Sequence, residues 1–159
     1  MNHDCSVTYR LADAGDTLKL SALLWEQITE FDQQDATLKD GYINDCHNHI
    51  RDRLGKDLFC FIAEGNGLIV SHIFILLTPK LPKLGRPNAS YARLSSVRTI
   101  PEYRNKGIGG TLMNHVIKFC KEKNSEEIIV WPSEESTGYY ERAGFNNENE
   151  IMEIEFFSG

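Results

Sequence analysis

Hydrophobic residues recur at two different spacings along this chain, and each spacing predicts its own kind of element. Apolar positions three or four residues apart predict helices, whereas alternating positions or short continuous apolar runs predict strands. The strongest helical stripe runs from Ile108 to Cys120, with charged residues mostly on the opposite face. We therefore expect helices over residues 16–31, 38–54, 108–123 and 136–142, and strands over residues 7–11, 58–64, 68–77, 92–99, 128–131 and 152–156.

Turn residues separate several of these elements. Gly65, Asn66 and Gly67 tolerate positive φ and lie between two apolar runs, which predicts a β-hairpin. Residues 79–90 contain three prolines and are expected to form a loop. The order β-α-α-β-β-β-α-β-α-β is mixed and is not a regular βαβ series, so we expect a mixed α/β (α+β) fold in a single domain over residues 1–159.

Composition and charge narrow the classes of function. A chain of 159 residues is large enough to bury roughly 68–70% of its unfolded surface. Its net charge of −6 argues against a general nucleic-acid binder. No apolar run approaches the ~20 residues of a membrane helix, no signal peptide is evident, and the four cysteines lack metal-type spacing. We therefore expect a cytoplasmic protein with free thiols, no metal site and no membrane partner.

A turn rich in glycine and cations lies between the strand at 92–99 and the helix that begins at Ile108. It comprises Arg104, Asn105, Lys106, Gly107, Ile108, Gly109 and Gly110. The first N–H groups of a helix are free, its dipole is positive at that end, and glycines let an anion approach the main chain. The turn lacks the ending of a Walker loop and the third glycine of a dinucleotide fingerprint. It therefore predicts a pyrophosphate site of another kind.

Two motifs carry a family resemblance. The segment from Leu94 to Gly109 reads LSSVRTIPEYRNKGIG, and Tyr140 to Phe145 reads YERAGF. Together they resemble the signature of the GNAT family of acyl-CoA N-acyltransferases, in which a Val-x-x-x-Pro strand end precedes an Arg/Gln-x-x-Gly-x-Gly/Ala helix start and a Tyr lies five residues before a Phe. The resemblance is specific from about Leu94 to Phe145, and element order alone supports it earlier in the chain.

The resemblance implies a fold and a cosubstrate. The fold would be a twisted, mostly antiparallel sheet of about six to seven strands flanked by about four helices. The cosubstrate would be acetyl-CoA. Main-chain N–H groups from Asn105 to Gly110 would hold its pyrophosphate, with Arg104 and Lys106 close to the phosphates. The backbone of Val97, Arg98 and Thr99 would pair with the pantetheine arm and polarise the thioester carbonyl.

The resemblance also assigns the acid, but not the base. Tyr140 would protonate the leaving thiolate, since a phenol of pKa ~10 can supply a proton to a thiolate whose conjugate acid is near ~8.5. The strand at 91–96 carries no carboxylate. Deprotonation of the amine by water relayed through Ser96, by Glu30 or by Glu64 all remain open. His72 lies in the middle of a strand, where a histidine is more often a core or edge residue than a base.

The expected function is acetyl transfer from acetyl-CoA to a primary amine, on a small molecule or a peptide, by direct attack in a ternary complex. The alternative is a non-catalytic acyl-CoA-binding sensor of the same fold, which would need neither Tyr140 nor an acceptor pocket. A homodimer is left open. An acidic cluster in the first third favours a cationic acceptor over a nucleic acid, although such acids also commonly line a solvated loop; it comprises Glu30, Asp32, Asp35 and Asp40.

Overall fold

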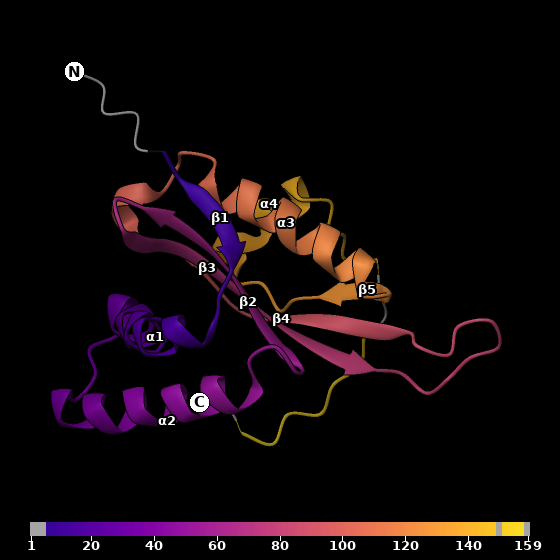
Figure 1. Ribbon diagram of the computed structural model, residues 1–159, viewed down its shortest axis with the longest axis horizontal. Coiled ribbons are helices and arrows are strands. Elements are labelled where there is room, and N and C mark those ends of the chain that lie inside the picture. Colours follow the sequence, from indigo (N-terminus) through magenta and orange to yellow (C-terminus); the bar gives the residue numbers. More distant parts are fainter. Residues whose placement is uncertain (1–5, 149–150, 158–159) are drawn as a thin grey trace.

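A five-stranded mixed sheet forms the centre of the molecule in a computed structural model that describes residues 6–148 and 151–157 (Figure 1). The strand order is β1-β2-β3-β4-β5; the first three pairings are antiparallel and β4 with β5 is parallel. The mixed α/β prediction is confirmed, with fewer strands in the described ranges than the six to seven expected. The strands are β1 (Thr8–Leu11), β2 (Leu58–Gly65), β3 (Leu68–Pro79), β4 (Ser90–Thr99) and β5 (Ser125–Ile129).

Helices cover both faces of the sheet. Helices α1 and α2 pack together on one face, and α3 and α4 lie on the other (Figure 1). Leu20 of α1 and Ile50 of α2 are buried against apolar residues of β2 and β3, whereas Leu112 and Val116 of α3 enter the larger core on the opposite face. The helices are α1 (Thr17–Phe31), α2 (Lys39–Arg53), α3 (Ile108–Glu122) and α4 (Thr137–Arg142), with short 3₁₀ turns η1 (Ala14–Asp16), η2 (Ala36–Leu38), η3 (Pro101–Tyr103) and η4 (Glu134–Ser136). No helix in the described residues is long and apolar enough to cross a membrane.

The expected hairpin joins β2 and β3. Asn66 and Gly67 adopt φ of 53° and 75°, the conformation that a tight turn between twisted antiparallel strands requires. The hairpin places His72 in the middle of the sheet, opposite Arg98 of β4. The sequence pattern thus predicted the turn, and the structure adds that β3 is the central strand of the sheet.

The basic residues of the loop between β3 and β4 pair with acids of β5. Lys80 contacts Glu126 and Glu127 at 2.9 and 2.7 Å, and Arg86 contacts Glu126 at 2.9 Å. These contacts hold the loop against the neighbouring strand. The cluster of cations that the sequence shows here is therefore largely neutralised within the fold.

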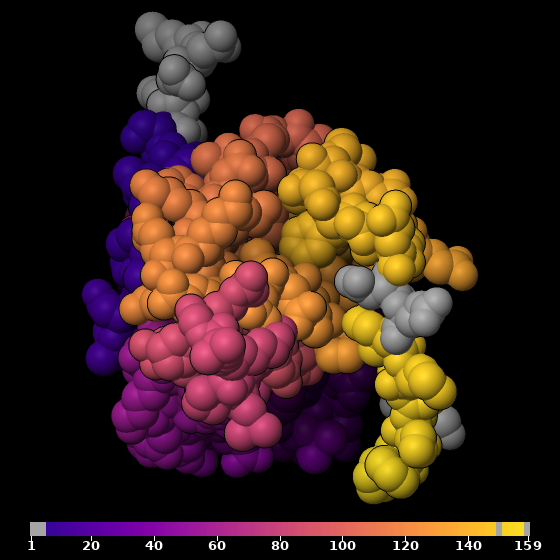
Figure 2. All heavy atoms as spheres, turned by 90° about the vertical axis from the view of Figure 1, so that its right-hand side faces the viewer, coloured from indigo at the N-terminus to yellow at the C-terminus, as the bar shows by residue number. Residues whose placement is uncertain are grey.

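The prediction of a half-buried strand at 152–156 is wrong. Residues 151–157 have no regular structure, and Met152 and Phe156 are 95% and 85% exposed. Figure 2 shows this segment, in yellow, extending from the body as a separate arm. The alternation of apolar and acidic residues is a pattern suited to a strand. An apolar strand face needs a packing partner, however, and none covers this segment within the described ranges.

Candidate active site

Strands β4 and β5 separate where the site begins. Pairing between β4 and β5 runs from Ser90 to Arg93 on β4 and then stops. A β-bulge at Ser95 shifts the register with β3, because Ser96 pairs with Phe74 but Leu94 pairs with Ile75. Beyond Arg93 the edge of β4 that faces away from β3 therefore has no strand partner among the described residues.

Alternation along β4 determines which groups face this open edge. Ile100 donates its N–H to the Val70 carbonyl at 2.9 Å, so Arg98, two residues earlier, also directs its backbone at β3. Val97 and Thr99 direct theirs at the open edge. The Thr99 carbonyl accepts from Arg104 Nε at 2.8 Å, which leaves both Val97 groups and the Thr99 N–H to meet a bound molecule.

A cavity of about 1060 Å³ lies along the open edge, between β4 and helices α1, α3 and α4. Its walls combine segments that are far apart in the sequence, including Gln27 of α1 and Trp131 after β5. All but one of the residues predicted for the site line this cavity. They are Ser96, Val97, Arg98, Thr99, Arg104, Asn105, Gly107, Ile108, Gly109, Gly110 and Tyr140.

The glycine turn forms one end of the cavity. Asn105 and Gly107 adopt left-handed φ of 59° and 77°, and Gly107 is the N-cap of α3 without a side-chain capping bond. The first helical hydrogen bond at this end runs from the Thr111 N–H to the Gly107 carbonyl. The N–H groups of residues 108–110 therefore have no helical partner and are available to an anion.

Gly109 and Gly110 serve this end in different ways. A Cβ on Gly109 would lie 3.4 Å from both Thr99 Oγ1 and the Tyr139 ring, so glycine permits β4, α3 and α4 to approach closely. A Cβ on Gly110 would meet no atom within 4 Å. Because Gly110 also lines the cavity, that open space is room for a ligand.

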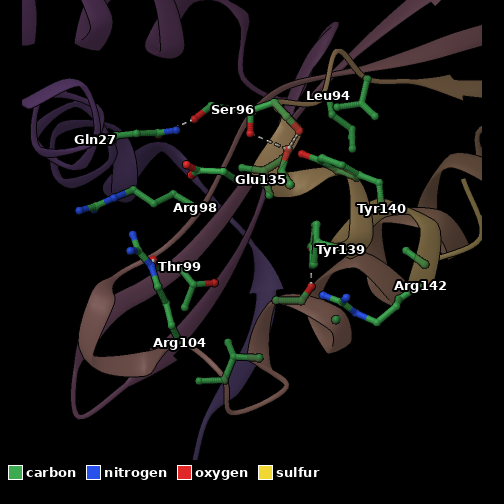
Figure 3. Close-up of a pocket in the computed structure, with 18 of the residues that line it drawn as sticks. Gln27, Leu94, Ser96, Arg98, Thr99, Arg104, Glu135, Tyr139, Tyr140 and Arg142 are labelled. Carbon is green, nitrogen blue, oxygen red and sulfur yellow. Dashed lines mark hydrogen bonds between the residues drawn. The ribbon is translucent and has the colours of Figure 1, made fainter. Parts of the chain in front are cut away.

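The cationic groups of Arg98, Arg104 and Lys106 do not surround the end of the cavity that the glycine turn forms. Arg98 donates from Nε to Glu30 at 3.0 Å, and Arg104 also pairs with Glu30, so both guanidinium groups are directed toward α1 (Figure 3). Lys106 does not line the cavity, and its ammonium lies 5.2 Å from the centre of the Tyr103 ring. Arg142 of α4, which sequence reasoning missed, lines the cavity on the side of α3 (Figure 3) and forms no ion pair within the described ranges.

Tyr140 reaches the cavity from α4. It is 7% exposed and packs edge-on against Phe145 and Tyr139, with ring centres 5.4 and 5.0 Å apart. Burial raises the pKa of its phenol, so the group stays protonated at neutral pH. The neighbouring Tyr139 hydroxyl donates to the Gly109 carbonyl at 2.8 Å, which ties α4 to the glycine turn and orients the helix that carries Tyr140.

Ser96 belongs to a buried hydrogen-bond cluster on the opposite wall. Its hydroxyl donates to Gln27 Oε1 at 2.8 Å, and His72 Nε2 lies 3.1 Å from Ser96 Oγ and 3.3 Å from the same Gln27 oxygen. Since the Ser96 proton is directed at Gln27, His72 Nε2 carries a hydrogen and donates. Burial, with Arg98 nearby, lowers the pKa of His72 to about 3, so the imidazole is neutral. His72 therefore orients Ser96 and cannot take up a second proton near neutral pH.

The two carboxylates considered as bases are occupied by arginines. Burial acts to raise the pKa of Glu30, but hydrogen bonds from Arg104 and Arg98 outweigh it and lower the pKa. Glu64 pairs with Arg10 at 2.9 Å, which lowers its pKa, and it does not line the cavity. Of the other acids in the first third, Asp35 caps η2 by accepting from the Thr37 N–H at 2.9 Å. Much of the acidic cluster therefore has a structural use.

Sequence similarity to known proteins identifies the family of this chain. The chain matches the model of the Acetyltransferase (GNAT) family over residues 19–145, and it belongs to that family. It is 26% identical over 106 residues to the glucosamine 6-phosphate N-acetyltransferase of Trypanosoma brucei brucei, covering 67% of this chain and 70% of that protein.

Two solved structures share the fold. A predicted acetyltransferase from Clostridium acetobutylicum, crystallised with acetyl-CoA, has a TM-score of 0.75 at 21% identity and covers 94% of this chain and 96% of its own. The glucosamine-6-phosphate N-acetyltransferase of Arabidopsis thaliana has a TM-score of 0.71 at 19% identity, covering 96% and 99%. At this identity they establish the fold alone.

Sequence reasoning missed the side chains that come from outside the two motifs. Gln27 and Glu135 line the cavity, yet neither stands in a recognisable pattern. Gln27 lies on the inner face of α1. The sequence signal that could have identified it is an amide side chain within an apolar helical stripe. Glu135 follows Glu134 in an exposed turn, where adjacent acids ordinarily indicate only solvent contact.

Proposed function

We propose that this protein transfers an acetyl group from acetyl-CoA to a primary amine, on a small molecule or a peptide, by direct attack within a ternary complex. The observation that carries the proposal is a single cavity lined by an open strand edge, an uncapped helix N-terminus and a buried tyrosine. These three features match the amide-rich arm, the pyrophosphate and the leaving thiolate of acetyl-CoA. Residues 1–159 would act as one domain.

The coenzyme would bind mainly through the main chain. The N–H groups of residues 108–110 would hold the pyrophosphate, assisted by the positive end of the α3 dipole. Arg142 would supply the cation beside the phosphates. Val97 and Thr99 would pair with pantetheine as an added strand, and a fixed N–H on this edge would polarise the thioester carbonyl as the oxyanion forms.

Tyr140 would act as the general acid. Amine attack forms the C–N bond and collapse of the tetrahedral intermediate breaks the C–S bond, so the thiolate must gain a proton. A buried phenol with a raised pKa is protonated before the reaction and can supply that proton. Tyr140 lines the cavity, and Figure 3 shows its hydroxyl directed into it.

Ser96 would position the acceptor nitrogen. Its hydroxyl proton is already directed at Gln27, so the group that it presents to the cavity is an oxygen lone pair, which accepts a hydrogen bond from an amine. Ser96 is thus better suited to orient the nucleophile than to relay a proton. The name of the trypanosomal relative places phosphorylated amino sugars among the acceptors to test, beside peptide N-termini, polyamines and aminoglycosides.

A direct test incubates the purified protein with acetyl-CoA and this amine panel while free thiol is measured. We expect thiol release with at least one amine and a matching acetylated product by mass spectrometry. Tight acetyl-CoA binding by calorimetry without acetylation of any panel amine would instead favour the acyl-CoA sensor. Failure to bind acetyl-CoA at all would exclude both functions.

A further inference from the structure

Glu135 is the one carboxylate among the described residues that line the cavity, and no described histidine lines it. It lies in η4, between β5 and α4, close in sequence to Tyr140. Figure 3 shows its side chain extending from η4 across the cavity toward the side of Gln27 and Arg98. A carboxylate in this position faces the place where an acceptor amine would meet Ser96.

The charge of Glu135 is not used by the fold. It forms no ion pair and no side-chain hydrogen bond within the described ranges, and it is exposed. This distinguishes it from Glu30 and Glu64, which are held by two arginines and one arginine respectively. A free carboxylate that points into a cavity can accept a proton, whereas one held by guanidinium groups is stabilised in its ionised form.

We propose that Glu135 is the general base that removes a proton from the acceptor ammonium; this inference rests on the acetyl transfer proposed above. The ammonium gives one proton to the Glu135 carboxylate, and the free amine, held by Ser96, attacks the thioester carbonyl. Collapse of the intermediate breaks the C–S bond as Tyr140 protonates the thiolate. The second nitrogen proton returns to the Tyr140 phenolate through solvent, and Glu135 releases its proton to solvent.

The spatial arrangement suits this division of labour. Glu135 comes from η4 and Tyr140 from α4, which follows it in the chain, while Ser96 faces them from β4. The proposed acid and the proposed base are therefore separate groups that line one cavity. Separate positions let the enzyme hold one group protonated and the other ionised at the same pH.

The test compares Glu135→Gln with the matched control Glu134→Gln. Both substitutions remove one negative charge from the same exposed 3₁₀ turn, but Glu134 does not line the cavity. The acceptors are the most rapidly acetylated alkylamine of the panel and a fluorinated counterpart of it, which is a weaker base and is largely uncharged at neutral pH.

For the alkylamine at pH 7, we expect Glu135→Gln to lower kcat by about a hundredfold or more, the usual range for loss of a general base, while Glu134→Gln stays near wild type. The defect of Glu135→Gln should shrink about tenfold for each pH unit as the free amine accumulates below its pKa of ~10. With the fluorinated amine, which needs no base, the defect should nearly vanish. Glu135→Asp, which keeps the charge on a shorter arm, should retain part of the activity.

Three results would overturn the inference. They are equal kcat for the two Gln variants, a rise in KM without a fall in kcat, or a kcat defect that is the same for both amines at every pH. Calorimetric affinity for acetyl-CoA checks that each variant is folded. Wild-type protein that acetylates no amine would defeat the proposed function itself, whereas an active wild type with an unaffected Glu135→Gln would defeat this inference alone.

Discussion

The two halves of the cavity are built from different parts of the polypeptide. The half that we propose for the coenzyme is made largely of main-chain groups, from Val97 and Thr99 on the open strand edge to residues 108–110 at the start of α3. The half that we propose for the acceptor is made of side chains, chiefly Gln27, Ser96 and Glu135. Main-chain groups survive most substitutions, so they suit a constant cosubstrate. Side chains can change one at a time, so they suit an acceptor that differs between relatives.

The halves also differ in what holds them in place. The glycine turn is joined to the end of β4 by the short turn η3 and is shaped by local backbone geometry. Helix α1 is attached to β4 by the pairing of Glu30 with Arg98 and Arg104, residues 68 and 74 positions apart in the sequence. A long-range ion cluster therefore positions the wall of the cavity that α1 forms.

The largest expected effect on turnover is that of a substitution at Tyr140. Tyr140→Phe keeps the ring that packs against Phe145 and removes the proton donor, so kcat should fall about 10²–10⁴-fold. Acetyl-CoA affinity measured by calorimetry should remain close to wild type. If kcat changed by less than about twofold while chemistry limited the rate, the thiolate would be protonated by another group.

Glu30→Gln should destabilise the wall of the cavity that α1 forms. The Arg98 side chain is only 8% exposed, and the substitution would leave it buried without its carboxylate partner. We expect the free energy of unfolding to fall on the order of 3 kcal/mol in denaturant titrations. Glu26→Gln on the same helix is the control, since Glu26 is 59% exposed and lies 3.8 Å from Arg98. Equal losses in the two variants would contradict the role of Glu30.

The loss of unfolding free energy in Glu30→Gln should depend on pH. Pairing lowers the folded-state pKa of Glu30 below its ordinary value of 4.5, so its contribution is complete above that pH. The contribution is lost as the pH falls through the folded pKa. Wild type and Glu30→Gln should therefore differ most near neutral pH and converge in acid.

Gly110→Asp should weaken the coenzyme half. The new carboxylate would enter the open space beside the α3 N-terminus and repel the pyrophosphate, raising the acetyl-CoA Kd by at least about tenfold. Gly110→Ala adds the Cβ without the charge and should bind nearly as well as wild type. Gly107 is a poorer probe, because its φ of 77° strains any other residue. Equal affinity for the Asp and Ala variants would remove the pyrophosphate assignment.

The smallest expected effect concerns His72. Its folded-state pKa of about 3 lies below the ordinary 6.5, so the unfolded chain binds a proton that the folded one does not. Stability should therefore fall as the pH drops from 6.5 toward 3, on the order of 1 kcal/mol for each pH unit over this range. His72→Gln should lack this part of the slope. Parallel pH profiles for the two proteins would show that His72 is not buried in neutral form.

Sequence reasoning succeeded where the structure depends on local backbone. The apolar stripe of α3, the hairpin turn at Asn66 and Gly67 and the glycine turn are each encoded within a few residues, and all were predicted. It did less well with charge, because it could not foresee that Glu30 is held by Arg98 and Arg104. Glu135 lies outside both sequence motifs. Its place in the cavity could not be predicted, because only the folded chain brings η4 to face β4. The segment at 151–157 shows the same limit, because an apolar pattern does not specify its partner.

The most direct test of this account is a crystal structure of the protein with coenzyme A. We predict that the pyrophosphate oxygens lie within hydrogen-bonding distance of the N–H groups of residues 108–110, and that the pantetheine amides pair with Val97 and Thr99. The thiol sulfur should lie next to the Tyr140 hydroxyl. Coenzyme bound elsewhere, or bound in this cavity with its phosphates away from the α3 N-terminus, would contradict the division of the cavity into a main-chain half and a side-chain half.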